Sequence, residues 1–99
     1  MGKRQVSILQ TAATAVAEIA FFIENKGMPA SAKKFTDEAF QFFDTLADDR
    51  IEYRKCIYKK WRALDYRCVT YKKKYAIAFI SGLTEITICD FVVAKLLKE

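Results

Sequence analysis

Ten of the 17 basic side chains in this 99-residue sequence fall between positions 50 and 75, beside only two acidic ones. That segment carries a net charge of +8 and the rest of the chain −3, which gives the overall charge of +5. A basic block favours a polyanionic or acidic partner, and an ordinary solvated surface is the alternative. The cations that could grip phosphates or an acidic protein surface are Lys59, Lys60, Arg62, Arg67, Lys72, Lys73, Lys74 and Lys95.

RNA cleavage is one chemistry that such a block could support. It requires cations that stabilise phosphate charge and groups that move protons at the 2′-hydroxyl and the leaving oxygen. Arg62 and Arg67 are the better phosphate ligands, because a planar guanidinium can bind a phosphate at two points. The candidates for catalysis are Arg62, Arg67, Lys72, Lys73 and Lys74. Trp61, Tyr66 and Tyr71 could stack on bases, although such side chains more often pack against a sheet.

The sequence contains no histidine, the side chain that most often transfers protons near neutral pH. A nuclease would therefore depend on Lys, Tyr, Asp or Glu, whose ordinary pKa values lie several units from neutrality. Histidine is also the commonest metal ligand. We accordingly expect neither a metal ion nor an organic cofactor.

The three cysteines, Cys56, Cys68 and Cys89, include no CxxC pair. An odd count without that motif argues against a disulfide framework and against structural zinc, so buried reduced thiols are expected. No signal peptide follows Lys3 and Arg4, and no apolar run reaches the roughly 18 residues of a membrane-spanning helix. We therefore expect a cytoplasmic protein without a membrane partner.

The first half of the chain predicts one strand and two helices. Residues 4–9 alternate weakly between apolar and polar side chains, which is typical of a short strand. Residues 12–24 carry apolar side chains on one helical face and stop before Gly27, because glycine tolerates positive φ. Pro29 suits the first position of a second helix, and the short break predicts an antiparallel hairpin. The apolar positions of the second helix, spaced by three and four, are Ala32, Phe35, Ala39, Phe42 and Leu46.

The end of the chain predicts a β-hairpin. Residues 74–80 and 83–88 alternate at period two and are rich in β-branched and aromatic side chains. Ser81 and Gly82 between them favour a two-residue turn.

Residues 50–75 are ambiguous. A helix is indicated by the spacing of Ile57, Trp61, Leu64 and Cys68. A strand that begins near Trp61 is indicated equally well, because every second residue from Leu64 to Cys68 is apolar or aromatic.

These elements predict a single α+β domain over residues 1–99, with an N-terminal strand and an antiparallel helical hairpin packed on a small antiparallel β-sheet. The second face of that sheet is expected to be partly open, with basic side chains projecting from it. If residues 50–75 formed one helix instead, the chain would be a four-helix bundle with a basic stripe. Such a bundle would be a non-toxic basic interaction or nucleic-acid-binding module.

The pattern resembles the RelE/ParE superfamily of bacterial toxins. The helical hairpin of that family is similar to residues 11–46, TAATAVAEIAFFIENKGMPASAKKFTDEAFQFFDTL, and its sheet to residues 66–95, YRCVTYKKKYAIAFISGLTEITICDFVVAK. The resemblance covers nearly the whole chain and rests on element order and apolar pattern. It implies the growth-inhibiting toxin of a type II toxin–antitoxin module, a system that stabilises plasmids or chromosomes.

The superfamily has two branches with different targets. RelE-like members cleave mRNA on the ribosome, whereas ParE-like members inhibit DNA gyrase and are not nucleases. RelE-like enzymes tend to carry an arginine after the tyrosine that corresponds to Tyr75, and this chain has Ala76 there. YoeB-like members end their last strand with a His-Tyr pair, and the matching positions here are Asp90, Phe91 and Val92. These departures favour a ParE-like gyrase inhibitor, with the ribosome-dependent endonuclease as the alternative.

The resemblance also implies a partner, namely an antitoxin with an acidic amphipathic tail. That tail is expected to meet the basic face of the sheet. The expected assembly is a dimer or a heterotetramer with antitoxin. The expected contacts with antitoxin or target are Lys59, Lys60, Arg62, Arg67 and Lys95.

Overall fold

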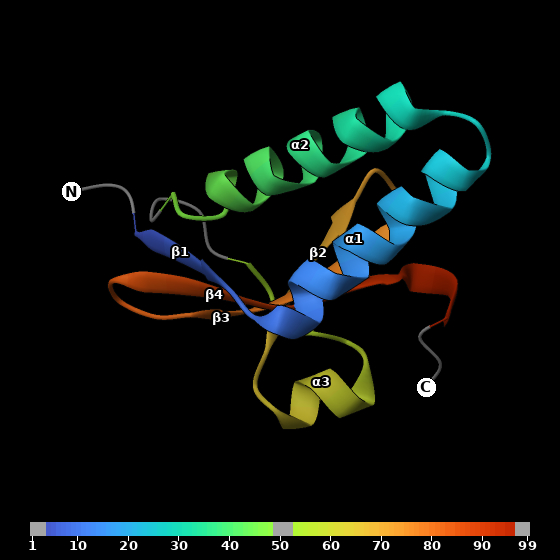
Figure 1. Cartoon of the computed structure of the whole chain (residues 1–99). Coiled ribbons are helices and arrows are strands. Elements are labelled where there is room, and N and C mark those ends of the chain that lie inside the picture. The colour runs from blue at the N-terminus through green and yellow to red at the C-terminus, as the bar shows by residue number, and fades with distance from the viewer. Residues whose placement is uncertain (1–3, 49–52, 97–99) are drawn as a thin grey trace.

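The computed structural model describes residues 4–48 and 53–96 (Figure 1). The strands are β1 (Gln5–Ile8), β2 (Arg67–Tyr71), β3 (Tyr75–Ser81) and β4 (Glu85–Val93). The helices are α1 (Gln10–Asn25), α2 (Pro29–Thr45) and the short α3 (Lys59–Ala63), and a 3₁₀ turn (Ala94–Leu96) follows β4. This order confirms the α+β prediction and rules out the four-helix bundle. None of the helices within the described residues is both long and apolar enough to cross a membrane.

The sheet is mixed, which corrects the expected antiparallel sheet. Its strand order is β1-β4-β3-β2, and the β2–β3 and β3–β4 pairs are antiparallel. β1 lies parallel to β4, with Val6 opposite Ile86 and Ile8 opposite Ile88. Parallel neighbours need a long crossover, and the connection from β1 to β4 runs through both long helices, α3 and the β2–β3 hairpin.

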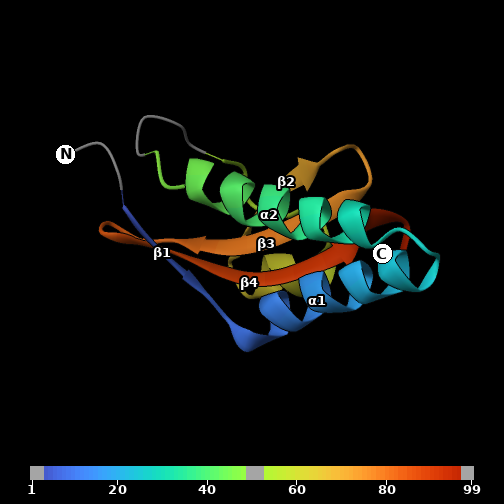
Figure 2. The same cartoon turned by 45° about the horizontal axis from the view of Figure 1, so that its top comes forward.

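The two long helices form the expected hairpin over one face of the sheet, and α1 runs beside β4 (Figure 2). Between them Gly27 adopts a φ of +84°, in the left-handed region that favours glycine. Pro29 is the first residue of α2, where its missing N–H costs nothing. The sequence signals for this turn are therefore confirmed.

Aromatic side chains fill the layer between the hairpin and the sheet. The rings of Phe35 and Phe43 on α2 meet the ring of Phe91 on β4 edge-on, with centroids 6.2 and 5.9 Å apart. The predicted stripe of α2 is buried except at Phe42, which is half-buried and stacks 4.7 Å from the Tyr71 ring. Phe43, which was not in the predicted stripe, is fully buried.

The ambiguous segment contains both a helix and a strand. α3 buries Trp61 but leaves Ile57 and Leu64 exposed, so the predicted helical stripe is wrong beyond one turn. Asp65 has a φ of +63°, a left-handed conformation incompatible with continuing the helix, and β2 begins two residues later. Positions 50–52 of the basic segment lie outside the described residues.

The turn between β3 and β4 is longer than predicted. Ser81 still belongs to β3 and pairs with Ile86, and residues 82–84 connect the strands. The Gly82 N–H donates a hydrogen bond to the Glu85 carbonyl (2.9 Å). A Cβ at position 82 would lie 3.1 Å from the same carbonyl oxygen, which favours glycine.

β4 continues beyond its predicted end at Ile88 and contains a β-bulge. Ala78 pairs with Asp90 whereas Phe79 pairs with Ile88, so Cys89 is an extra residue on β4. The bulge shifts the alternation by one residue. Ile88 and Phe91 therefore both pack against the helices, and the strand continues to Val93.

The second face of the sheet is covered, which corrects the expectation of a partly open basic face. Residues 55–66, here called the cap, include α3 and lie on the side of the sheet opposite α1 and α2 (Figure 1). Trp61 is 5% exposed and clusters with Ala76 and Ala78 of β3. The two alanines leave space on this face for the indole ring.

Cys56 and Cys68 form a disulfide that joins the cap to β2, with Cα atoms 4.8 Å apart. This corrects the prediction of three reduced thiols. The Cys56 N–H donates to the Tyr66 carbonyl (3.0 Å) and the Cys68 N–H to the Arg54 carbonyl (3.2 Å), so the chain folds back against β2 and brings the two cysteines together. Cys89 is a free, buried thiol.

Candidate protein-interaction site

An apolar groove of about 860 Å³ runs between α1 and the C-terminal half of β4. Ala12 and Val16 of α1 are buried in the core, while Ile19 and Ile23 pack against the core but stay half-buried and line the groove. The apolar lining comes from both elements and from the start of β3: Ala15, Ile19, Phe22, Ile23, Tyr75, Phe91, Val92 and Val93.

Two neighbouring aromatic residues of α1 are exposed and line two adjoining hollows, which share Gln10, Thr14 and Glu18. Phe22 is 60% exposed and lines the groove. Phe21 is 64% exposed and lines a shallower hollow on the outer side of α1, beside Ala13 and Ala17. Two exposed aromatic side chains next to an apolar groove are typical of a protein-interaction surface.

The rim of the groove carries charges of both signs. The ammonium groups of Lys26 and Lys74 each lie over an aromatic ring of the groove, 4.7 and 5.6 Å from the ring centroids. Glu18 and Asp90 also line it. The Asp90 carboxylate accepts the backbone N–H of the next residue (2.9 Å).

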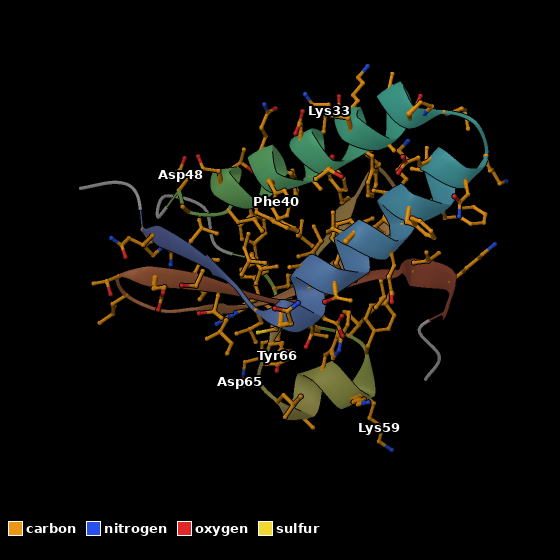
Figure 3. The ribbon with its side chains drawn as sticks, viewed as in Figure 1. Lys33, Phe40, Asp48, Lys59, Asp65 and Tyr66 are labelled. Carbon is orange, nitrogen blue, oxygen red and sulfur yellow. A yellow bond between two sulfur atoms is a disulfide. The ribbon has the colours of Figure 1, made fainter. Side chains whose placement is uncertain are left out.

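The structure brings together Lys59, Lys60 and Arg62, which lie on α3 and are exposed. The side chain of Lys59 extends from the cap away from the sheet (Figure 3). At the base of the cap, Lys55 Nζ lies 3.0 Å from Asp65 Oδ1, and this hydrogen bond lowers the pKa of the Asp65 carboxyl below its ordinary 3.8. The cap is therefore a compact basic surface on the side of the sheet opposite the helical hairpin.

Arg67 and Lys95 are not part of that surface. Arg67 is half-buried on β2, and its guanidinium donates to the Tyr53 carbonyl (2.9 Å), which ties the chain before the cap to the strand. Lys95 is exposed beyond the end of β4, on the 3₁₀ turn.

Lys72, Lys73 and Lys74 form the tip of the β2–β3 hairpin. The φ angles of Lys72 and Lys73 are +53° and +60°, and the Lys74 N–H donates to the Tyr71 carbonyl (3.1 Å), as in a type I′ turn. Lysine rarely adopts this conformation. Lys72 also reaches α2, where its ammonium binds the Glu38 carboxylate at 2.6 Å.

The candidates for catalysis are not brought to one centre. Arg62 precedes β2, whereas the lysine turn follows it (Figure 1). The strand between them, Arg67–Tyr71, spans about 13 Å at the usual rise per residue. Ala76, the position at which the RelE-like branch tends to have arginine, is 3% exposed and lies beneath the cap.

The aromatic side chains that could stack on bases point into the protein. Trp61 and Tyr71 are 5% and 6% exposed, within the two hydrophobic clusters. Tyr66 is half-buried and hydrogen-bonds with the Cys89 thiol, and burial raises the pKa of its phenol. Burial also raises the pKa of the Cys89 thiol, so this cysteine is not an activated nucleophile.

The part of the chain that the structure describes holds no group of three or more Cys, Asp or Glu side chains that could bind a metal ion. The groove is lined mainly by apolar side chains, and the cap presents Lys59, Lys60 and Arg62 to solvent. The sequence analysis did not predict the groove. The pair Phe21–Phe22 near the end of an otherwise amphipathic helix is the sequence feature that could have indicated it.

The fold is similar to that of a chain in the chromosomal ParDE toxin–antitoxin (TA) system from P. aeruginosa. The two structures align with a TM-score of 0.73 over 92% of this chain and 96% of that chain, at 15% sequence identity. No family model matches the sequence, and no curated protein matches it. The likeness therefore establishes a shared fold and confirms the ParE-like architecture that the sequence resemblance implies.

Proposed function

We propose that this protein is the toxin of a type II toxin–antitoxin pair. The observation that carries the proposal is the similarity, over 92% of this chain, to a chain of the ParDE toxin–antitoxin system. The open apolar groove beside α1 supports it independently, because a toxin of this class is neutralised by a partner that must cover a surface of it.

The groove is the proposed docking site of an acidic amphipathic antitoxin segment. Its apolar walls, with Phe22 on one side and Phe91 on the other, would take the apolar face of that segment. Lys26 and Lys74 on the rim would pair with its acidic residues. Charge complementarity of this kind speeds association and makes it sensitive to salt.

The toxic effect is proposed to arise from binding to DNA gyrase rather than from cleavage of mRNA. Without histidine, a nuclease would need Lys, Tyr or carboxylate groups with strongly shifted pKa values. The ion pair of Lys72 with Glu38 lowers the pKa of the carboxyl and raises the pKa of the ammonium, so both move away from neutrality. Binding to gyrase needs only a shaped surface, for which we propose Lys59, Lys60 and Arg62 of the cap, with Lys95 as a peripheral contact.

A paired assay in a bacterial host tests the mechanism. After induction, a DNA-damage reporter and the 5′ ends of messenger RNAs are followed in the same culture. A gyrase inhibitor should activate the reporter and leave translated messages intact. New codon-aligned 5′ ends without DNA damage would reject gyrase as the target. They would support the RelE-like alternative, in which Arg62, Arg67 and the lysines at 72–74 would be the first residues to test.

A further inference from the structure

The cap covers the outer face of the sheet with little regular structure of its own. α3 has only five residues, far fewer than an isolated helix needs for stability. Ile57 and Leu64 of the cap are 71% and 55% exposed and contribute little burial. The cap is held by the buried Trp61 with Tyr58 and Tyr66 packed around it, by the backbone pairing of Lys55 with Arg67, and by the Cys56–Cys68 disulfide.

We propose that the Cys56–Cys68 disulfide is a redox-controlled clasp, which holds the basic cap against the outer face of the sheet when oxidised and releases it when a dithiol reductant opens the bond. The disulfide closes a ring across a sequence separation of 12 residues, nearly all of them in the cap. Such a cross-link restricts the open states of the enclosed segment far more than those of the remaining chain. The role as a switch rests on the cytoplasmic location expected from the sequence, because disulfides in reducing compartments are usually transient and redox-sensing.

The two sulfur atoms differ in access, which sets the direction of the exchange. Cys56 is 1% exposed, whereas Cys68 on β2 is half-buried. A thiolate of the dithiol reductant attacks the Cys68 sulfur, the S–S bond breaks, and the Cys56 thiolate leaves and takes up a proton. The second thiol of the reductant then displaces Cys68 from the mixed disulfide. Two electrons pass to the protein, which gains two thiols, and the reductant becomes a disulfide.

Cys89 does not take part in this exchange. It is 4% exposed, lies on β4, and its thiol contacts the Thr87 carbonyl at 3.5 Å. The clasp therefore consists of one defined pair, and the third cysteine provides a matched control.

Opening of the clasp would move Lys59, Lys60 and Arg62 away from the sheet and uncover Ala76 and Ala78, on which Trp61 packs. The clasp itself does not depend on the proposed function. Only the consequence that target binding changes with redox state rests on that proposal.

Limited trypsin digestion of the whole protein tests the clasp, because Lys55, Lys59, Lys60 and Arg62 place four cleavage sites within the cap. Oxidised and dithiothreitol-reduced samples are digested, and the cut sites are identified by mass spectrometry after full reduction. Reduction should accelerate cleavage within the cap by about ten-fold or more, since cleavage follows local opening. Cleavage after Lys33 and Lys34 of α2, and the far-ultraviolet circular dichroism, should stay unchanged.

Two variants complete the test. Cys68→Ser should be cut in the cap at the fast rate with or without reductant, whereas Cys89→Ala should respond to reductant like the wild type. Equal cap cleavage in oxidised and reduced wild type would overturn the proposal, as would the absence of a Cys56–Cys68 cross-linked peptide from oxidised protein. Neither outcome depends on toxicity, so failure of the clasp and failure of the proposed function are distinguishable.

Discussion

The Lys72 ammonium lies 2.6 Å from the Glu38 carboxylate and joins the β2–β3 turn to α2. This ion pair gives a structural reason for lysine at a position where φ is +53° and glycine or asparagine would be usual. One of the three lysines of the turn is thereby engaged within the protein. The charge of the turn offered to a partner comes from Lys73 and Lys74.

Replacing Lys72 with methionine should raise the pKa of Glu38 toward its ordinary value of 4.5, because the hydrogen bond from Lys72 is the main cause that lowers it. Glu38 in the folded protein releases its proton more readily than in the unfolded chain. The pair therefore stabilises the fold above pH 4.5, and this contribution is lost as the pH falls through the lowered pKa. An NMR titration of the Glu38 carboxyl measures the shift, with Lys73→Met as the control. Identical Glu38 titrations in Lys72→Met and wild type would contradict the pairing.

Phe22→Ala should weaken antitoxin binding by about 2 kcal/mol, or roughly 30-fold, because it removes an aromatic anchor of the groove. The exposed position predicts little change in the free energy of unfolding. Phe21→Ala is the matched control, since Phe21 is similarly exposed but lines a different hollow. Isothermal titration with the purified antitoxin candidate measures both variants. A larger loss from Phe21→Ala would place the partner on the outer side of α1 instead.

Lys26→Glu and Lys74→Glu, as separate variants, should each slow association with the acidic partner and flatten its dependence on salt. Both cations lie on the groove rim. Stopped-flow association rates across a salt series provide the measurement. Lys60→Glu, on the cap, changes the net charge in the same way at a surface on the other side of the sheet. If Lys60→Glu alters the salt slope as strongly as the rim variants, the partner docks on the cap.

Ala76→Arg should lower the free energy of unfolding by about 3 kcal/mol or more, because a guanidinium would be buried beneath Trp61 without a partner. Thr70→Arg is the control, since Thr70 is the cross-strand neighbour of Ala76 on β2 and is exposed. Urea denaturation compares the two variants. A stable Ala76→Arg protein would show that the cap leaves room at the position the RelE-like branch uses.

The sequence predicted the elements whose signals are local. Gly27 and Pro29 mark the helical hairpin because each suits one special backbone position, and the alternation around Ile77 and Ile86 marks the last two strands. These features depend on neighbouring residues alone. The parallel pairing of β1 with β4 depends instead on a crossover of the whole chain, which no local pattern records.

The features that sequence reasoning missed arise from contacts between distant segments. The bulge at Cys89 reverses the alternation of β4, so the period-two pattern appeared to stop at Ile88. The disulfide requires the chain before α3 to fold back on β2, and the spacing of Cys56 and Cys68 carries no sign of that return. The groove depends on how α1 is placed beside β3 and β4, which are distant from it in the sequence. The basic residues form one block in the sequence, and the structure divides them among the cap, the turn and internal contacts.

Growth of a bacterial host after induced expression tests the central claim most directly. The protein is expressed alone and together with the product of the gene adjacent to its own, and soluble protein is quantified in both cultures. A toxin of a toxin–antitoxin pair should arrest growth when expressed alone, and co-expression of the neighbouring product should restore it. Normal growth at high soluble expression of the protein alone would contradict the claim.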